Sequence, residues 1–482
     1  MSTAESLASH LERPLGRGYA PEGAFTGAAG GAACGDLIRV SLALDPDSPD
    51  GQIVDAGFDA SGCGASIAAG SAVVGLVRGA PWLDAAMVGA EKIAGELGGL
   101  SAAKRHAAEL AADALHRALG AAVRASAVLA RRDDRTLVAM SGGVDSAVAA
   151  LLATREGAEA VGVTLELWSD PENDGEASCC SAQAVRGARE VAHGLGMPHL
   201  SIDLRAEFRA GVVDRWLEDH AAGLTPNPCV RCNGNVRLDA MLDLARRLGS
   251  ETLVTGHYAR LEDGPVLRTA ADIGKDQSYV LSALDPRSLS KLRFPLGDMH
   301  KEEVRAMAKR AGLAVARKRD SQDLCFLAGT RQGEFLERHG GLGRRPGPIV
   351  DQRGRALGEH RGAHVYTVGQ RHGLGIGGGE PLYVLSTDMS SNTVIVGPRE
   401  ELLASRVQIC DLTLHRYASD VDGVRVRAHG RRFGCRLGEN LAPGRYELAD
   451  VVLDEPAERT APGQFACLYS GDVIVGHGTV AA

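Results

Sequence analysis

The sequence is poor in aromatic residues and has no long apolar run. Phe, Trp and Tyr make up 4% of the 482 residues, whereas glycine alone contributes 61. No uncharged apolar stretch approaches the roughly 18–20 residues of a membrane span, and the first twenty residues lack the apolar core of a signal peptide. No Gly-X-Y period accompanies the glycines, which excludes a collagen-like fold. We therefore expect a globular, cytoplasmic protein with no membrane partner.

Cysteine is too sparse for a disulfide-stabilised scaffold, because ten cysteines are spread over 482 residues. In a reducing compartment such thiols are either core residues or reactive groups. The net charge is −8, of which residues 1–130 carry −5 (9 basic and 14 acidic side chains) and the remainder −3. The charge of the whole chain therefore gives no sign of a nucleic-acid partner.

Basic character is local. The runs at 317–319, 344–345 and 431–432 are candidates to face phosphates, although such runs more often lie on a solvated surface. Arg425 and Arg427 alternate on an expected strand, so both should point to one face, which suits a nucleic-acid backbone groove.

The first segment predicts an α+β unit. Up to about Gly79 it reads mainly as short strands, DLIRVSLAL and QIVDAGFDA, separated by glycine-rich turns. From Asp84 to Ala130, alanine and leucine recur at spacings of three and four, which indicates helices. Strands followed by helices are typical of α+β folds, and the charged stretch 131–135 is expected to be a linker.

A different pattern begins at Thr136. Short apolar strands (TLVAM, AVGVTLELW, HLSIDL, TLVTGHYA) alternate with helical segments such as AVAALLATREG and AQAVRGAREVAHGLG, which predicts a parallel, doubly wound sheet. After about Gly340 only turn signals and short alternating runs follow, which predict small β-barrels. We expect four domains, at 1–130, 131–338, 339–400 and 401–482.

A glycine-rich turn carries the strongest motif. Residues 141–146, SGGVDS, follow a buried-type strand and open a helix. Glycines let a backbone approach a phosphate closely, and a helix N-terminus presents free N–H groups and the positive end of its dipole. The Walker pattern is absent, since no Gly-Lys-Ser/Thr appears. The string resembles the PP-loop of ATP pyrophosphatases, which cleave ATP between the α and β phosphates.

A C-x-x-C pair follows two prolines. Cys229 and Cys232 come after the string TPNP, so we expect both thiols on a rigid, non-helical loop. Alone, this pair is compatible with zinc, a redox pair or an iron–sulfur site. A structural zinc site would require a second pair, which the sequence does not contain. Cys325 in DSQDLCF has polar neighbours, which argue against a buried core thiol.

From about Leu137 onward the chain resembles the tRNA-uridine 2-sulfurtransferases of the MnmA/TrmU type. The matching strings are SGGVDS, CCSAQA, TPNPCVRCN, TGHYAR, GKDQSYVL, FPLGDMHKEEVR, DSQDLCFL, PGPIVD, YTVGQRHGLGI, GEPLYV and APGQFACLYSGD. The resemblance implies an α/β PP-loop ATPase domain of Rossmann-like type, a small β-rich middle domain and a C-terminal β-barrel. It implies ATP- and Mg²⁺-dependent 2-thiolation of the wobble uridine in tRNAs for Lys, Glu and Gln. The C2 oxygen is adenylated and then displaced by protein-bound sulfur, which releases AMP.

The resemblance also implies roles for individual residues. Cys232 matches the family's nucleophile, and Cys325 matches the cysteine that carries a persulfide, with disulfide bonding and a sulfur donor such as a cysteine desulfurase or relay protein implied as well. The nucleotide-contacting positions are Ala139, Met140, Ser141, Gly142, Gly143, Val144, Asp145, Ser146, Leu165 and Gly256. The tRNA-contacting positions are Asn227, Pro228, Cys229, Lys275, Asp276, Gln277, Arg427 and Ala428. Without the resemblance, Lys275 and Asp276 would read as a solvated charge pair.

Cys229 departs from the best-known members, which have an aspartate that is expected to help in acid–base chemistry. A thiol replaces that carboxylate poorly at neutral pH, because its unperturbed pKa is about 8.5 rather than about 3.9. Cys229, Cys232 and Cys325 together would provide three soft ligands, the number that suits a 4Fe–4S cluster with one open iron. Our hypothesis is that such a cluster delivers sulfur. The alternative is a persulfide mechanism with Cys229 as a bystander.

The first segment resembles the IscU/NifU scaffold on which iron–sulfur clusters are assembled. The strings are GGAACGDLIRV and FDASGCGASIAAGSAVVGLVRG, which put Cys34, Asp36 and Cys63 on the family's ligand positions. The family's third cysteine follows a histidine, whereas here His106 is followed by Ala107. These residues and His106 could still ligate a metal or a transferred cluster. A degenerate domain that only docks a cysteine desulfurase is the alternative.

The remaining cysteines and one histidine are expected to be structural or to have no certain role. Cys179 and Cys180 are assigned to local structure, and Cys410, Cys435 and Cys467 to strand cores or faces. His257 ends a strand near the expected ATP site, where packing and nucleotide contact are equally compatible. The rival functions are 4-thiolation of uridine, thiolation of another tRNA base, and, in a different class, an iron–sulfur carrier with a nucleotide-binding module.

Overall fold

The computed structural model describes residues 3–30, 35–126, 128–170, 181–262, 265–320, 324–327, 329–377, 380–428, 430–438 and 440–482, with backbone only for 3–6 and 235. The chain forms two compact units. The first contains Met1–Arg205, Asp239–His257 and Lys291–Cys325, and the second contains Ala206–Leu238, Tyr258–Ser290 and Phe326–Ala482. Among the described residues, no helix is long and apolar enough to cross a membrane.

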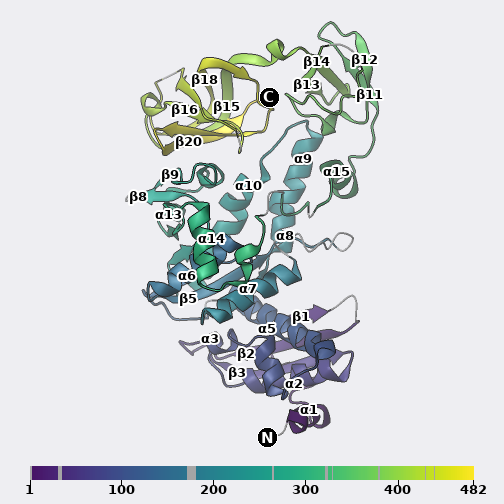
Figure 1. Cartoon of the computed structure of the whole chain (residues 1–482), viewed down its shortest axis with the longest axis vertical. Coiled ribbons are helices and arrows are strands. Elements are labelled where there is room, and N and C mark those ends of the chain that lie inside the picture. Colours follow the sequence, from purple (N-terminus) through teal and green to yellow (C-terminus); the bar gives the residue numbers. More distant parts are fainter. Residues whose placement is uncertain are drawn as a thin grey trace. The chain divides into compact units, whose positions relative to one another are not determined.

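The N-terminal part of the first unit is an α+β layer, as predicted (Figure 1). Strands β1 (Phe25–Gly30), β2 (Leu37–Leu44) and β3 (Ile53–Ser61) form an antiparallel sheet in that order. The helices are α1 (Thr3–Glu12), α2 (Gly64–Val77), α3 (Trp82–Ala85), α4 (Ala90–Glu96) and α5 (Arg105–Ala125).

The prediction that the chain up to Gly79 is mainly strands was wrong for α1 and α2. Helix α2 has the sequence GASIAAGSAVVGLV, and ten of its fourteen residues are buried. A helix that is apolar on every side leaves no 3.6-residue alternation to detect, so its sequence looks like a string of small residues and turns.

The rest of the first unit is the doubly wound sheet that the strand–helix alternation predicts. Its strands run parallel in the order β10-β7-β4-β5-β6. They are β4 (Arg135–Ala139), β5 (Glu159–Glu166), β6 (His199–Asp203), β7 (Thr252–Val254) and β10 (Leu292–Arg293). Its helices include α6 (Val144–Arg155), α7 (Ala182–Gly194), α11 (Leu238–Arg247) and α14 (Lys301–Arg310).

The stretch 131–135 is not wholly a linker, because Arg135 is buried and begins β4. Its guanidinium donates to Glu159 at 2.5 Å and to the carbonyl of Leu248 at 2.9 Å. From sequence alone, a charged residue before a strand is expected to be exposed to solvent. Arg135 is buried instead, because its hydrogen-bond partners Glu159 and Leu248 lie far from it in the chain.

Helix α5 is shared between two cores. It packs on β1 and β2 on one side and on β6 of the parallel sheet on the other (Figure 1). Gly27 of β1 lies against the backbone of Ala114 and Ala118, and Gly120 lies against the carbonyl oxygen of Ser201 in β6; a Cβ at either glycine would clash with backbone atoms. The N-terminal layer and the parallel sheet therefore form one continuous packed body.

The second unit combines helices with two β structures, in agreement with the predicted β-rich C-terminal half. Its helices are α8 (Arg205–Phe208, whose first residue belongs to the first unit), α9 (Asp214–Ala221), α10 (Pro228–Arg231), α12 (Ser278–Leu281), α13 (Pro286–Leu289) and α15 (Gln332–Gly340). A four-stranded sheet has the order β12-β11-β14-β13, with β11 (Gly347–Val350), β12 (Ala356–His360), β13 (Tyr383–Asp388) and β14 (Thr393–Gly397).

The second β structure is a closed six-stranded barrel. Its strands are β15 (Leu403–Leu414), β16 (Gly423–Arg425), β17 (Phe433–Leu437), β18 (Gly444–Glu458), β19 (Phe465–Ser470) and β20 (Val473–Val480), and pairing of β15 with β20 closes the ring. The hairpin β8 (Arg260–Glu262) and β9 (Val266–Arg268) extends the sheet at β20. The barrel is filled by aliphatic side chains such as Leu412, Val451 and Val475.

Candidate functional site

The predicted phosphate loop lies at the carboxyl end of β4. Gly142 has φ of +67°, and Gly143 is the N-cap of α6 in an extended conformation. The Ser146 hydroxyl donates to the carbonyl of Gly143 at 3.1 Å and lies 3.2 Å from both the amide nitrogen and the hydroxyl of Ser141. These bonds hold a tight turn whose next backbone N–H groups belong to the first turn of α6, the geometry that binds anionic groups.

Gly142 of the loop and Gly256 are required by close approach. A Cβ at Gly142 would lie 2.6 Å from the carbonyl oxygen of Ala184, the third residue of α7. A Cβ at Gly256 would lie 2.7 Å from the amide nitrogen of Ser146. The structure therefore brings Gly256, which follows β7, against the helix N-terminus, as the predicted nucleotide set requires.

The remaining nucleotide positions also lie at this sheet edge. Ala139 and Met140 are buried at the end of β4, and Leu165 is buried one residue before the end of β5. Val144 begins α6 and is buried, and Asp145 follows it. Crevices at the carboxyl ends of parallel strands are the usual ligand sites of such sheets.

Two lysines contact this loop, and of these sequence reasoning missed Lys301. Lys301, the first residue of α14, is buried and donates to both carboxylate oxygens of Asp145 at 2.8 Å; it also lies 2.9 Å from Asp320. Lys318, from the basic run 317–319, donates to the carbonyl of Gly142 at 2.9 Å. Lys301 shares a face with Val304, at a spacing of three, and a lysine on an apolar helix face signals a buried partner.

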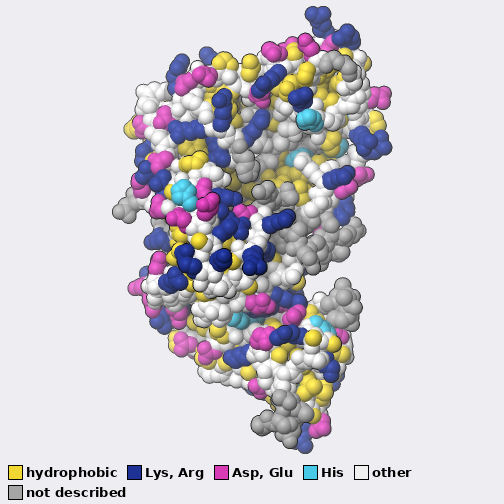
Figure 2. All heavy atoms as spheres, viewed as in Figure 1, with side chains coloured by type: hydrophobic (Ala, Val, Ile, Leu, Met, Phe, Trp, Pro, Cys, Tyr) yellow, Lys and Arg dark blue, Asp and Glu magenta, His cyan; other side chains and the backbone are white. Residues whose placement is uncertain are grey.

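Asp320 connects this network to the cysteine segment. Its carboxylate also accepts from Arg305 at 2.7 Å, one turn further along α14. Figure 2 shows Lys and Arg side chains gathered over the part of the first unit where Figure 1 has α14 and α6, so a basic face exists in a chain of net charge −8.

The C-x-x-C segment is helical, which corrects the prediction of a non-helical loop. Asn227 caps α10, and its side-chain oxygen accepts from the amide of Cys229 at 3.0 Å. Pro228 occupies the first helical turn, where the missing N–H costs nothing. From Cys232 a π-helical turn, η3 (Cys232–Arg237), follows, and such turns are frequent at functional sites.

The three candidate cysteines differ in burial. Cys232 is buried, whereas Cys229 and Cys325 are half-buried. The side-chain amide nitrogen (Nδ2) of Asn233 donates to the carbonyl of Cys229 at 3.1 Å. Phe326, the residue after Cys325, is buried against Trp216, with ring centroids 5.3 Å apart, so the chain is anchored directly beside Cys325.

The predicted tRNA segments of the second unit are built around one buried carboxylate. The Asp276 side chain is 1% exposed, so the reading as a solvated pair was wrong for it. It accepts from the amides of Ala270 and Ser278 at 3.0 and 3.2 Å and forms an ion pair with Arg425 at 3.2 Å. Gln277 is fixed by two bonds to the backbone of Tyr258.

Arg425 corrects the groove prediction. Strand β16 ends at Arg425, which is largely buried and donates to the carbonyls of Arg427 and Ala428 as well as to Asp276. It also lies over the Tyr279 ring, 5.4 Å from its centroid. Burial raises the pKa of Tyr279. Arg425 thus joins the segments at 276 and 427–428.

The segment before the cysteines is also held by the barrel. The amide of Thr225 donates to the carbonyl of Pro462 at 2.8 Å, and the Gln464 side chain donates to the carbonyl of Thr225 at 2.5 Å. Both barrel residues belong to the string APGQF, so the motif at the C-terminus and the motif TPNP form one structure.

A potential metal site lies in the N-terminal layer. One ligand atom each from Asp36, Cys63 and His106 lies within 4.8 Å of the others. The Cys63 thiol and His106 Nε2 each lie 3.3 Å from Asp36 Oδ2. The Ser66 hydroxyl first, then Cys63 and His106, lower the pKa of Asp36 by hydrogen bonding despite its burial. A carboxylate, a thiol and an imidazole in reach of one point suit zinc or iron.

The remaining residues singled out in the sequence lie in several parts of the chain. Cys34 lies outside the described residues, as do Cys179 and Cys180. Ala107, next to His106 in α5, is fully buried. In the barrel, burial raises the pKa of Cys435 and of Cys467 to about 12, so the assignment of both to the core is confirmed. Cys410 is half-buried on β15. His257 bonds to Thr255 Oγ1 at 2.8 Å.

Four known domain families match successive parts of the chain. Residues 3–125 match the NifU-like N terminal domain, 134–329 the tRNA methyl transferase HUP domain, 333–398 the tRNA methyl transferase PRC-barrel domain, and 400–480 the aminomethyltransferase beta-barrel domain. The fold and the loop at the end of β4 thus define a PP-loop protein joined to a NifU-like domain, and the fold expected from the resemblance is confirmed.

Whole-chain relatives narrow this class. A bifunctional protein NifU/MnmA of Rubrobacter xylanophilus is 42% identical over 487 residues, which cover 98% of this chain and 97% of that protein. The chain belongs to this NifU/MnmA family. The tRNA-specific 2-thiouridylases MnmA of Thermobifida fusca and Frankia casuarinae are 46% and 44% identical over 72% of this chain, and 95% and 98% of those proteins are covered.

Proposed function

We propose that the chain is an ATP-dependent tRNA-uridine 2-sulfurtransferase. The observation that carries the proposal is the loop of residues 141–146, with its Gly142 turn, the helix N-terminus that follows it and Gly256 packed against it. The 46% identity to a tRNA-specific 2-thiouridylase supports the same reaction. tRNAs for Lys, Glu and Gln are the expected substrates, and the wobble uridine is the expected target.

In this proposal the reaction has two steps. The C2 oxygen of the uridine attacks the α-phosphorus of ATP, the bond between the α-phosphorus and the bridging oxygen breaks, and pyrophosphate leaves. A sulfur nucleophile then attacks C2, the bond between C2 and oxygen breaks, and AMP leaves. The loop amides bind the phosphates, and the carboxylate of Asp145 is the hard oxygen ligand available to Mg²⁺ beside them.

The cysteines have separate roles in the proposal. In the persulfide alternative, a cysteine desulfurase or relay protein leaves a persulfide on Cys325, and its outer sulfur attacks C2 as AMP leaves. The Cys232 thiolate then attacks the Cys325 sulfur, so that the S–S bond breaks, the outer sulfur stays on C2 and a Cys232–Cys325 disulfide forms, which an added thiol reduces. Asn227, Pro228 and Cys229 face the target base, and the segments at 275–277 and 427–428, tied by Arg425, contact the tRNA. The bonds from Pro462 and Gln464 to Thr225 support a fixed position for the base-facing segment.

The test is mass spectrometry of nucleosides from tRNA incubated with the full chain and ATP, in one arm with sulfide and in the other with a cysteine desulfurase, L-cysteine and a thiol reductant. We expect 2-thiouridine, and its loss in Cys232→Ser. Conversion to 4-thiouridine instead would establish the rival uridine thiolation, and modification of another base would point to a different substrate. With no thiolated nucleoside at all, an iron–sulfur carrier with a nucleotide-binding module would replace the enzyme assignment.

We further propose two iron sites. Cys229, Cys232 and Cys325 would hold a 4Fe–4S cluster, for which three soft thiolates are the appropriate ligands. Cys63, Asp36 and His106, with Cys34, would hold a metal ion or a transferred cluster; the reach of the first three to one point supports this. Ala107 at the expected third cysteine argues against complete scaffold chemistry, so docking of a desulfurase is the competing role.

Iron and acid-labile sulfide in anaerobically purified protein separate these sites. We expect Cys325→Ala and Cys229→Ala to lose one cluster equivalent, and Cys34→Ala or Cys63→Ser to lose iron or zinc from the N-terminal domain. Serine and alanine are poor ligands for soft metals, so each loss should be nearly complete. A wild-type protein without iron, together with full thiolation by Cys229→Ala, would establish the persulfide mechanism.

A further inference from the structure

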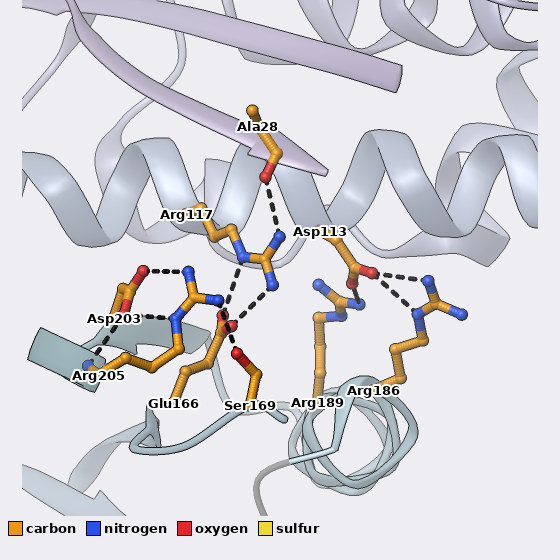
Figure 3. A network of polar contacts seen from close by, with 9 residues as sticks. All are labelled: Ala28, Asp113, Arg117, Glu166, Ser169, Arg186, Arg189, Asp203 and Arg205. Atoms are coloured by element: carbon orange, nitrogen blue, oxygen red, sulfur yellow. Dashed lines mark hydrogen bonds and ion pairs between the residues drawn. The ribbon is translucent and has the colours of Figure 1, made fainter. Parts of the chain in front are cut away.

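Helix α5 belongs by sequence to the NifU-like domain, yet its polar side chains reach into the nucleotide-binding sheet. Figure 3 shows Arg117 pointing from α5 toward Glu166 on one side and toward the carbonyl of Ala28 on the other. Arg117 Nε and NH2 donate to the two Glu166 oxygens at 3.0 and 2.7 Å, and NH1 donates to Ala28 of β1 at 2.8 Å. This is the two-pronged arginine–carboxylate geometry, which fixes orientation as well as charge.

A second contact lies one turn earlier on the same helix. Asp113 accepts from Arg186 Nε at 2.9 Å and also pairs with Arg189, and both arginines lie on α7 (Figure 3). The Asp113 side chain is largely buried and that of Arg189 almost completely so. Ion pairs shielded from water in this way are specific in position, because loss of one partner leaves an uncompensated charge.

The two elements held by α5 are those that border the phosphate loop. Glu166 ends β5 directly after Leu165, a predicted nucleotide position, and is buried. Helix α7 begins at Ala182, and its Ala184 carbonyl is the atom that a Cβ at Gly142 would meet at 2.6 Å. A shift of either element would move a wall of the nucleotide site.

We propose that Arg117 is a positioning residue of the nucleotide site, supplied by the NifU-like domain, and that ATP affinity depends on its contact with Glu166. The inference rests on the proposed binding of ATP at the loop of residues 141–146. It gives the N-terminal domain a role in the thiolation half that does not require a bound metal. A residue that acts through packed neighbours in this way typically changes affinity by about 5- to 150-fold.

The test is equilibrium binding of a non-hydrolysable ATP analogue with Mg²⁺ to the full chain at low temperature. We expect Arg117→Gln to weaken binding by about 10-fold, while thiolation at saturating ATP stays within about threefold of wild type. Because Arg117 acts through Glu166, the double variant with Glu166→Gln should be no weaker than either single variant. Arg117→Lys, which keeps the charge but loses the two-pronged contact, should be intermediate.

The matched control is Arg105→Gln. Arg105 is on the same helix and pairs with Glu91, so both partners lie within the NifU-like domain. The Arg105→Gln variant should bind the ATP analogue with the affinity of wild type. Thermal unfolding shows whether each variant is folded. If Arg117→Gln is not folded, the affinities of Arg117→Lys and Glu166→Gln are compared with that of wild type instead.

The outcomes separate the inference from the proposed function. If wild type binds the analogue and Arg117→Gln binds equally well, the positioning role is wrong and ATP binding stands. Equal weakening by Arg117→Gln and Arg105→Gln would reduce the effect to general destabilisation and overturn the inference. If wild type does not bind the analogue, both the ATP site and its positioning residue are wrong.

Discussion

Replacing Lys301 by methionine is expected to slow pyrophosphate release from ATP and tRNA by about 100-fold, the effect typical of losing one preorganised charged group at a reacting site. Lys301 holds both oxygens of Asp145 at 2.8 Å and Asp320 at 2.9 Å. Without its ammonium group, two carboxylates next to the phosphate loop lose their shared cation. Asp145 then loses the cation that bonds both of its oxygens, and uncompensated negative charge lies where the ATP phosphates are proposed to bind.

The measurement is single-turnover pyrophosphate release at saturating ATP with substrate tRNA. Lys301→Arg should recover part of the rate, because it restores the charge in a different shape. Lys92→Met, an exposed lysine of α4, removes the same charge from the same unit and should behave as wild type. A rate for Lys301→Met within about threefold of wild type would contradict the role of Lys301, whatever its effect on stability.

A single methyl group at position 120 is expected to destabilise the first unit by about 2 kcal/mol, the middle of the range for overpacking a filled core. Gly120 lies inside α5, where alanine would by propensity alone stabilise the helix by about 1 kcal/mol. A Cβ there would clash with the backbone carbonyl of Ser201, which is part of β6 and cannot move without disturbing the sheet. The steric cost therefore outweighs the gain in propensity.

Urea unfolding followed by circular dichroism measures this change. Gly187→Ala is the control, because Gly187 is inside α7 and a Cβ there meets nothing within 4 Å. It should raise the midpoint, while Gly120→Ala lowers it, so the same substitution has opposite signs at the two helices. Equal midpoint shifts for the two variants would mean that α5 and β6 are not in close contact.

Local pattern predicted the fold well where short apolar strands alternate with helices and where strands alternate between buried and exposed residues. Strands β4 to β7 and helices α6 and α7 lie where alternation and periodicity put them, and the barrel follows from short alternating runs. Helix α2 was missed because it is apolar all round. The closing pair β15–β20 and the packing of α5 on β6 join residues far apart in the chain, for which local patterns carry no signal.

The candidate site was predictable to the extent that its chemistry is contiguous in sequence. The loop at 141–146 and the pair at 229 and 232 follow from motifs, and the trio Asp36, Cys63 and His106 follows from the resemblance of the first segment to a scaffold family. Lys301, Arg425 and Arg117 did not, because each acts by reaching a carboxylate more than 45 residues away. From sequence alone, a charged residue is expected on the surface, because its partner far along the chain cannot be recognised.

The segment between α5 and β4 is fixed by backbone hydrogen bonds, which restricts how far the N-terminal layer can move relative to the parallel sheet. A carrier domain that swings between stations needs a slack tether of many residues. Here Val128 and Arg132 donate backbone bonds to Arg247 and Gly249 of the nucleotide half, and Ala130 donates to Pro49 of the N-terminal layer. The trio Asp36, Cys63 and His106 therefore has a fixed place within the first unit. A metal or cluster bound there, as proposed above, would have to leave by release into solution or by transfer to another protein.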